Sequence, residues 1–140
     1  MHIPARFPDA YIPDVHLRLT MYKRIASANT LEELNELQVE TIDRFGLLPD
    51  AAKNLFSIAE LKLNATACDI RSLDIGQSGG RIKFVSNPNI NIDKLMRAIA
   101  SNPLEFRFVG AEAIQVMREM PSSTERFAMV NEVFDLVRND

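Results

Sequence analysis

The sequence is poor in the side chains that build covalent and metal cross-links. Its 140 residues include one cysteine, Cys68, and two histidines, His2 and His16. A single cysteine excludes an internal disulfide and a zinc site built from several cysteines, and neither histidine stands at a ligand spacing from Cys68 or from the other histidine. Cys68 has no histidine or basic helix start beside it, which favours an inert, partly buried thiol over a nucleophile. We therefore expect no metal site, no catalytic residue and a reducing, cytoplasmic setting.

Long hydrophobic runs are also absent. The apolar stretches are far shorter than the ~20 residues of a membrane-spanning helix, and no basic, apolar leader with a cleavage site opens the sequence. The composition, 46% hydrophobic and 25% charged, is that of an ordinary soluble domain with its own core. The net charge of -3 argues against a general polyphosphate binder. We expect no membrane partner.

Three prolines and an uneven distribution of charge divide the N-terminal half. Pro4, Pro8 and Pro13 bias residues 1–14 toward an extended arm, which we interpret as the end of a linker, with residues 15–140 forming one C-terminal regulatory or interaction domain. Residues 15–28 are basic, whereas residues 29–69 are acidic. The proline-rich arm, which stands where a helix or strand would be expected, suggests a piece of a longer polypeptide.

Capping residues predict three helices. Asp14 can cap a helix over residues 15–28, and Thr30 followed by Glu33 is a capping-box spacing that starts a helix at residue 31. Gly46 can end that second helix after residue 45, and Pro49 opens a third helix that runs to about residue 67. The spacing of apolar residues predicts the buried face of the first helix as Val15, Leu19, Tyr22 and Ile25 or Ala26.

After Cys68 the apolar period changes from 3.6 to 2. Two strand pairs and two helices are predicted there, each strand pair closed by a glycine-containing turn. The residues expected to point inward are Leu73, Ile75, Ile82 and Phe84 in the first pair, Ile92, Leu95, Met96 and Ile99 in a helix over residues 92–101, Leu104, Phe106, Phe108, Ile114 and Val116 in the second pair, and Phe127, Val130, Phe134 and Val137 in a helix from 123 to about 138. The predicted fold class is α+β: three N-terminal helices followed by a ββαββα unit with antiparallel hairpins.

Two surface patterns are candidates for binding phosphate or nucleic acid. The glycine-rich turn at residues 76–80 lacks the Lys-Ser/Thr pair and the following helix of a phosphate loop, which favours a hairpin turn. Four basic residues gather on the predicted strands without an interleaved aromatic residue for base stacking. They are Arg71, Arg81, Lys83 and Arg107. A solvated strand face is the simpler interpretation, and a nucleic-acid-binding accessory domain remains the alternative function.

The second helix carries the candidate partner-binding residues. Its acidic residues occupy the arc opposite the apolar face, where they form either a solvated face partly neutralised by the basic first helix or a docking surface for an arginine-bearing partner. Docking is favoured because Val39 lies on the outward side, and because the acids near the C-terminal end of the helix oppose its macrodipole. The candidate partner-binding residues are Glu36, Val39, Glu40 and Asp43.

Several sequence runs resemble the C-terminal domain of the bacterial transcription-repair coupling factors, the Mfd family. They are the runs Tyr11-Ile12-Pro13-Asp14, Tyr22-Lys23-Arg24 and above all Ile42-Asp43-Arg44-Phe45-Gly46-Leu47-Leu48-Pro49, with the hairpin Gly79-Gly80-Arg81-Ile82-Lys83-Phe84 in support. The resemblance covers residues 3–136. One departure is Thr41, where a leucine is common in the family.

The resemblance implies a function that this chain shares with a larger protein. The parent factor is expected to be an ATP-hydrolysing DNA translocase that removes stalled RNA polymerase and recruits nucleotide-excision repair, with its ATP and magnesium site upstream of this region. The domain itself is expected to be a non-catalytic clamp. It packs on an N-terminal module similar to the repair protein UvrB and hides the surface that recruits UvrA, using carboxylates that correspond to Glu40 and Asp43.

Overall fold

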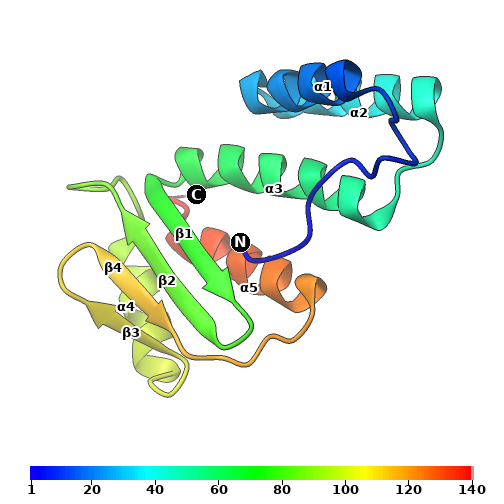
Figure 1. Cartoon of the computed structure of the whole chain (residues 1–140). Coiled ribbons are helices and arrows are strands. Elements are labelled where there is room, and N and C mark those ends of the chain that lie inside the picture. Colours follow the sequence, from blue (N-terminus) through cyan, green and yellow to red (C-terminus); the bar gives the residue numbers. More distant parts are fainter. Residues whose placement is uncertain (140) are drawn as a thin grey trace. The chain divides into compact units, whose positions relative to one another are not determined.

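The computed structural model describes residues 1–139, and internal contacts divide them into two compact units. The helical unit is Pro4–Leu63, and the sheet unit joins Met1–Ile3 to the residues from Asn64 onward. Each unit is taken by itself below. The helical unit contains α1 (Val15–Ser27), α2 (Leu31–Phe45) and most of α3 (Asp50–Ala67), and Figure 1 labels all the elements.

The helix ends in the helical unit follow their capping residues. Asp14 accepts hydrogen bonds from the backbone N–H groups of His16 and Leu17 and so starts α1. At the start of α2, the Thr30 hydroxyl accepts from the Glu33 N–H at 3.1 Å. Gly46, with a φ of 95°, closes α2 in a conformation that favours glycine. The predicted bounds of α2 are confirmed, and the predicted first helix is one residue too long.

Residues 4–13 form part of the core of the helical unit although they form no helix or strand. Phe7 and Ile12 are 2% and 0% exposed. The Phe7 ring packs against Tyr22 of α1 and Phe56 of α3, with centroids 5.2 and 6.4 Å apart. The Phe7 N–H donates to the Tyr22 hydroxyl, and the Tyr11 hydroxyl donates to the Gly46 carbonyl. The proline-rich arm is therefore held by both packing and hydrogen bonds.

The predicted buried face of α1 is partly wrong. Val15 and Leu19 are 54% and 52% exposed, and the buried residues of this helix are Met21 and Ile25. The apolar side chains of α1 span more than half of its circumference, so their spacing alone does not choose a face. The core of the unit, which includes Phe7 and Ile12 from the arm, packs on the side that carries Met21.

The sheet unit contains four antiparallel strands in the order β1-β2-β4-β3. The strands are β1 (Ile70–Gly76), β2 (Gly79–Phe84), β3 (Phe106–Val109) and β4 (Ala113–Val116), with α4 (Ile92–Ser101) and α5 (Ser123–Val137) beside them. In Figure 1 both helices lie behind the sheet. The predicted α+β order of three helices followed by ββαββα is confirmed.

The register of the strands separates an apolar face from a polar face. Ile82 of β2 pairs with Ile114 of β4, which pairs with Phe108 of β3, and Ile82 and Ile114 are almost fully buried. Four predicted inward positions are wrong: Ile92 and Met96 of α4 are 48% and 54% exposed, Leu104 in the turn before β3 is 88% exposed, and Phe108 of β3 is 41% exposed. On α4, Leu95 is the buried residue.

The glycines of the first hairpin serve close backbone packing. Gly79 has a φ of 113°, and a Cβ atom there would overlap the carbonyl oxygen of Val116 in β4. A Cβ atom on Gly80 would overlap the carbonyl of Asp74 in β1. The turn therefore packs against its own sheet, as predicted for a hairpin.

Across residues 1–139, no helix combines the length and apolar character of a membrane span.

Candidate functional site

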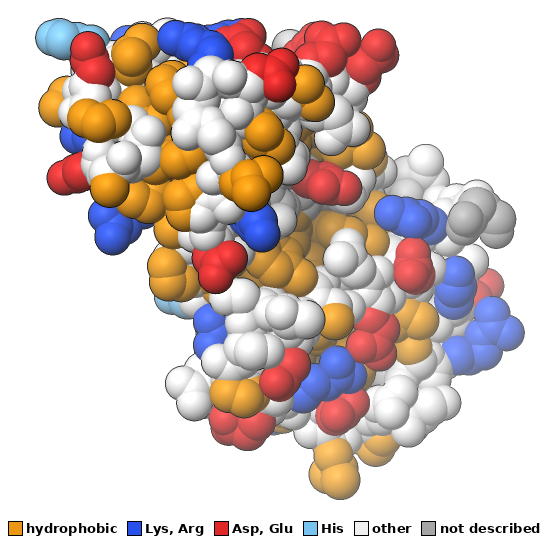
Figure 2. Space-filling view, turned by 90° about the vertical axis from the view of Figure 1, so that its right-hand side faces the viewer, with side chains coloured by type: hydrophobic (Ala, Val, Ile, Leu, Met, Phe, Trp, Pro, Cys, Tyr) orange, Lys and Arg blue, Asp and Glu red, His pale blue; other side chains and the backbone are white. Residues whose placement is uncertain are grey.

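The four predicted partner-binding residues lie on the outer side of α2. Val39, Glu40 and Asp43 come three, four and seven residues after Glu36, which places all four on one side of the helix. Val39 is 58% exposed, and Glu36 and Asp43 are exposed. Figure 2 shows hydrophobic side chains among the charged groups on the surface of the helical unit. We call these four residues the α2 face.

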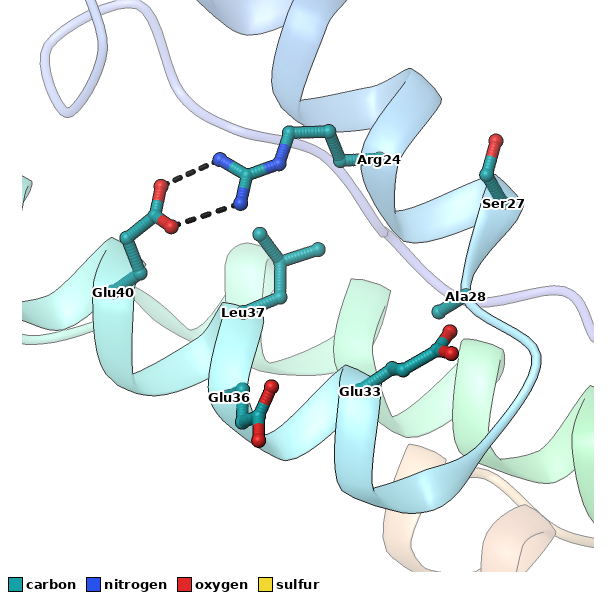
Figure 3. Close-up of a pocket in the computed structure, with 7 residues that line it drawn as sticks. All are labelled: Arg24, Ser27, Ala28, Glu33, Glu36, Leu37 and Glu40. Carbon is teal, nitrogen blue, oxygen red and sulfur yellow. Dashed lines mark hydrogen bonds and ion pairs between the residues drawn. The ribbon is translucent and has the colours of Figure 1, made fainter.

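A cavity of about 360 Å³ lies beside the α2 face, between α1 and α2. Its rim is acidic on the α2 side, where Glu33, Glu36 and Glu40 line it, and Figure 3 shows Leu37 pointing from α2 toward α1 between Glu33 and Glu40. Arg24, Ser27 and Ala28 line it on the α1 side. Glu33 is used structurally, since its carboxylate accepts the Asn29 N–H at the start of α2 at 2.9 Å.

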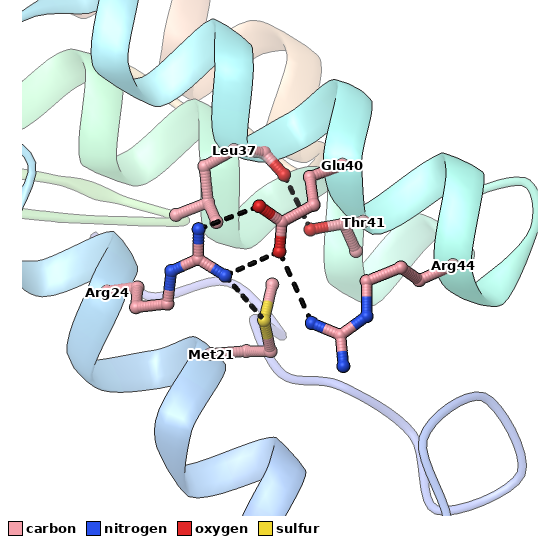
Figure 4. A network of polar contacts seen from close by, with 6 residues as sticks. All are labelled: Met21, Arg24, Leu37, Glu40, Thr41 and Arg44. Atoms are coloured by element: carbon pink, nitrogen blue, oxygen red, sulfur yellow. Dashed lines mark hydrogen bonds and ion pairs between the residues drawn. The ribbon is translucent and has the colours of Figure 1, made fainter.

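Glu40 is held by two arginines of its own unit, as Figure 4 shows. Arg24 of α1 donates from Nη1 to Oε2 at 2.5 Å and from Nη2 to Oε1 at 2.8 Å, which is a two-point contact. Arg44, one turn further along α2, donates to Oε2 at 3.2 Å. The contact ties α1 to α2. Neutralisation by the basic first helix, one of the two interpretations of the sequence, thus describes Glu40.

The two guanidinium groups lower the pKa of Glu40. The hydrogen bond from Arg24 is the largest cause, and with Arg44 it lowers the pKa of Glu40 to about 2. The same contact raises the pKa of Arg24. Glu40 is therefore ionised throughout the physiological range. It does no acid–base chemistry near neutral pH.

Asp43 and Glu36 differ from Glu40 because they have no hydrogen-bond or ion-pair partner within residues 1–139. Asp43 stands next to Arg44, but that guanidinium group is directed to Glu40 and also lies 5.0 Å from the centre of the Phe45 ring. These two carboxylates, with Val39 between them, are the free part of the α2 face. Beneath it, the buried Thr41 hydroxyl donates to the Leu37 carbonyl, so the polar residue is satisfied.

The basic residues of the strands lie on the exposed face of the sheet. Arg81 of β2 and Arg107 of β3 flank Gln115 of β4 in one row across the strands, and the Arg81 Nε–H donates to the Gln115 side chain at 2.9 Å. Lys83 and Arg71 are also exposed. The nearest acid in this row is Asp74, whose pKa is lowered by its hydrogen bond with His2. The structure brings these basic residues together on an exposed surface.

The described residues offer little to a metal ion or a covalent mechanism. Between residues 1 and 139, no three His, Cys, Asp or Glu side chains are grouped closely enough to hold a metal. Cys68 is 6% exposed, and burial raises the pKa of its thiol, which keeps it protonated.

The site residues that the sequence missed are Arg24 and Arg44. Their signal was the basic character of the first helix and the Arg44 position four residues after Glu40.

Comparison with known proteins identifies the family of this fold. A family model for the TRCF domain matches residues 1–95. The transcription-repair-coupling factor of Haemophilus influenzae is 42% identical over 138 residues, and that of Escherichia coli K12 is 39% identical over 132 residues. These matches cover 99% and 94% of this chain but 12% of each relative. The chain therefore spans about an eighth of the length of these relatives.

A solved structure supports the same assignment at the level of the fold. It is a crystal structure of the C-terminal domain of a transcription-repair coupling factor, and it superposes with a TM-score of 0.77 at 21% identity. The match covers 97% of this chain and 90% of that one. From the family model, the two relatives and the shared fold, this chain belongs to the TRCF domain family of the transcription-repair-coupling factors.

Proposed function

We propose that this chain is a non-catalytic regulatory domain that docks through the α2 face onto another module of its own parent protein. The docking module is the N-terminal region similar to the repair protein UvrB, and docking hides the surface of that module that recruits UvrA. Asp43 and Glu36 bind arginine side chains of the module, and Val39 supplies an apolar contact between them. Release of the clamp exposes the UvrA-binding surface.

The parent protein carries the chemistry in this proposal. It is an ATP-hydrolysing DNA translocase that displaces stalled RNA polymerase and recruits nucleotide-excision repair, and its ATP and magnesium lie outside this region. The glycine turn of the first hairpin does not fit a nucleotide phosphate, because its glycines pack against the carbonyl groups of Val116 and Asp74. This domain contributes control over the access of UvrA to the UvrB-like module.

One observation carries the proposal. Asp43 is exposed and unpaired near the C-terminal end of α2, within residues 1–139, in a position that the helix macrodipole makes unfavourable for an acid. The unpaired Glu36 and the exposed Val39 lie on the same side of the helix. A carboxylate kept where it does not stabilise its own helix is expected where a partner uses it, and the adjoining apolar side chain is typical of a protein interface.

Charge reversal at Asp43 tests the proposal. The separately purified UvrB-like module is titrated with this chain by calorimetry, using the wild type and D43R. Leaving a buried partner charge unpaired costs about 2–5 kcal/mol, so Kd should rise at least ~30-fold. The control is E60R, which makes the same charge change at an exposed residue of α3. Equal affinity of D43R and E60R, or no binding by the wild type, would refute docking through the α2 face.

The exposed row of Arg81 and Arg107 supports a second candidate function. Together with Lys83 it offers a flat basic surface that could contact the phosphate backbone of a nucleic acid. Binding of this kind weakens steeply with salt because counterions are released. Fluorescence anisotropy of a labelled duplex at low salt checks it, and the triple variant R81Q/K83Q/R107Q should abolish any binding. No binding by the wild type at high micromolar protein would remove this candidate.

A further inference from the structure

In the free domain, the carboxylate of Glu40 is already largely occupied. A carboxylate offers about four acceptor positions, and three are used here by the two bonds from Arg24 and the one from Arg44. A further guanidinium group can therefore add at most one hydrogen bond to Glu40 while Arg24 stays in place. The two-point contact that arginine makes with a carboxylate requires Arg24 to leave.

The charge around Glu40 also opposes a cationic partner. Two guanidinium groups surround one carboxylate, as Figure 4 shows, which leaves a local excess of positive charge. Asp43 and Glu36 carry the uncompensated negative charge of the α2 face. A partner arginine is thus attracted to Asp43 and repelled by Arg24 and Arg44 when it approaches Glu40.

Exchange at Glu40 does not require the unit to unfold. The side chains of Arg24, Glu40 and Arg44 are 43%, 38% and 43% exposed, so the Arg24 guanidinium can swing into solvent. Exposed ion pairs of this kind contribute little to stability, because water screens them. The backbone cap at the end of α1, an Ala28 N–H bonded to the Ile25 carbonyl, does not involve the Arg24 side chain.

We infer that Arg24 is a built-in competitor for the arginine of the docking partner at Glu40, and that this competition limits the affinity of the α2 face. The inference rests on the proposed function, since it assigns a regulatory residue to the same docking surface. Arg24 keeps the clamp weak enough to open. A partner must supply a guanidinium group that replaces Arg24, which a lysine cannot do with two parallel bonds.

The variant R24Q tests the competition. Removing the Arg24 charge frees Oε1 of Glu40 and leaves Oε2 with the bond from Arg44 alone, so Kd for the UvrB-like module should fall about three- to tenfold, mainly through faster association. The matched control is K23Q, which removes the same charge from the neighbouring residue of α1. Lys23 is exposed and has no ion-pair partner within residues 1–139. A gain in affinity by K23Q equal to that of R24Q would show a general charge effect and overturn the inference.

A double-mutant cycle separates competition from a structural role of Arg24. In an E40Q background there is no carboxylate to release, so R24Q should no longer improve binding. R24K should lie between the wild type and R24Q, because lysine keeps the charge but loses the two-point contact. If R24Q weakens binding, or improves it equally with and without Glu40, then Arg24 supports the fold of the face rather than competing for it.

The outcomes also distinguish this inference from the proposed function. If D43R abolishes binding while R24Q leaves Kd unchanged, the α2 face is the docking surface and the competition is wrong. If the wild-type chain does not bind the module at all, or if D43R binds as well as E60R, docking through the α2 face fails and the inference fails with it. Support for both requires weaker binding by D43R and tighter binding by R24Q.

Discussion

A carboxylate between two arginines, as at Glu40, makes folding sensitive to acid. Its pKa in the folded chain is about 2 against an ordinary value of 4.5, so the pair contributes fully above pH 4.5 and the contribution is lost as the pH falls toward 2. Because the pair is exposed and water screens it, the stability of the wild type should decrease only modestly more steeply over this range than that of E40Q. Urea unfolding at a series of pH values measures both.

The control for this experiment is D43N, which removes a carboxylate that has no partner within residues 1–139. It should retain the acid sensitivity of the wild type, whereas R24Q should lose much of it. A D43N curve as flat as that of E40Q would contradict the assignment of the effect to the Glu40 pair.

Because the Asp43 side chain is exposed to solvent, D43R should leave the free energy of unfolding near that of the wild type, within about 0.5 kcal/mol. E40R should lower the free energy of unfolding, because this substitution places a third arginine beside Arg24 and Arg44.

The single thiol provides a second prediction at this scale. Cys68 is buried and the pKa of its thiol is raised by that burial, so it should react slowly with a disulfide reagent in the folded protein. Unfolding in urea should increase the rate by orders of magnitude. The colour change of the reagent measures the rate of this thiol reaction in the folded and the unfolded protein. Rapid labelling without denaturant would show that the region around the end of α3 opens readily.

At the scale of single elements, the start of α2 depends on Thr30. Its hydroxyl satisfies the Glu33 N–H, so T30A should cost ~1 kcal/mol of stability by loss of the cap. T30S keeps the hydroxyl and is the matched control. The midpoint of urea unfolding distinguishes them. Equal midpoints for T30A and the wild type would mean that packing alone sets the beginning of this helix.

The sequence predicted element boundaries well because capping is a local interaction. Thr30 accepts a hydrogen bond from the N–H three residues later, as its capping-box spacing indicated, and Asn91 and Ser122 do the same at the starts of α4 and α5. Gly46 has the positive φ that its place after α2 suggested. All of these interactions form within a few residues. Their outcome depends little on the rest of the fold.

The buried faces of α1 and α4 were predicted less well because they depend on distant residues. Val15 and Leu19 continue an apolar helical spacing but are exposed, whereas Met21 is fully buried. On α4, Leu95 is buried and Met96 is exposed. Each of these helices has more apolar side chains than one face can hold. The tertiary contacts, which periodicity does not contain, decide which of them face the core.

In the candidate site too, periodicity predicts the exposed side of the helix but not the contacts between helices. The outward position of Val39 followed from helix geometry and is confirmed. The ion pair between Arg24 and Glu40 joins residues 16 positions apart on different helices. Only the packing of α1 beside α2 brings them together. Periodicity could suggest that two oppositely charged helices attract, but it could not select which carboxylate the arginine takes.

For the whole molecule, the arm before α1 is a source of stability. Phe7 is 2% exposed and contacts rings on α1 and α3, so F7A should cost ~3–5 kcal/mol, as a large cavity in a core does. F7L keeps most of the volume and should lose much less. Thermal unfolding of the two variants tests this. An F7A midpoint close to that of the wild type would mean that the arm contributes no core to the helical unit.

The buried arm also determines where this chain can be shortened. A recombinant version that began at Asp14, where regular secondary structure starts, would lack Phe7 and Ile12 and would leave a hollow between the aromatic rings of Tyr22 and Phe56. Such a shortened polypeptide should be prone to aggregate, because apolar surface that the arm normally covers would face water. Useful truncation points lie upstream of Pro4, although the first helix begins eleven residues later.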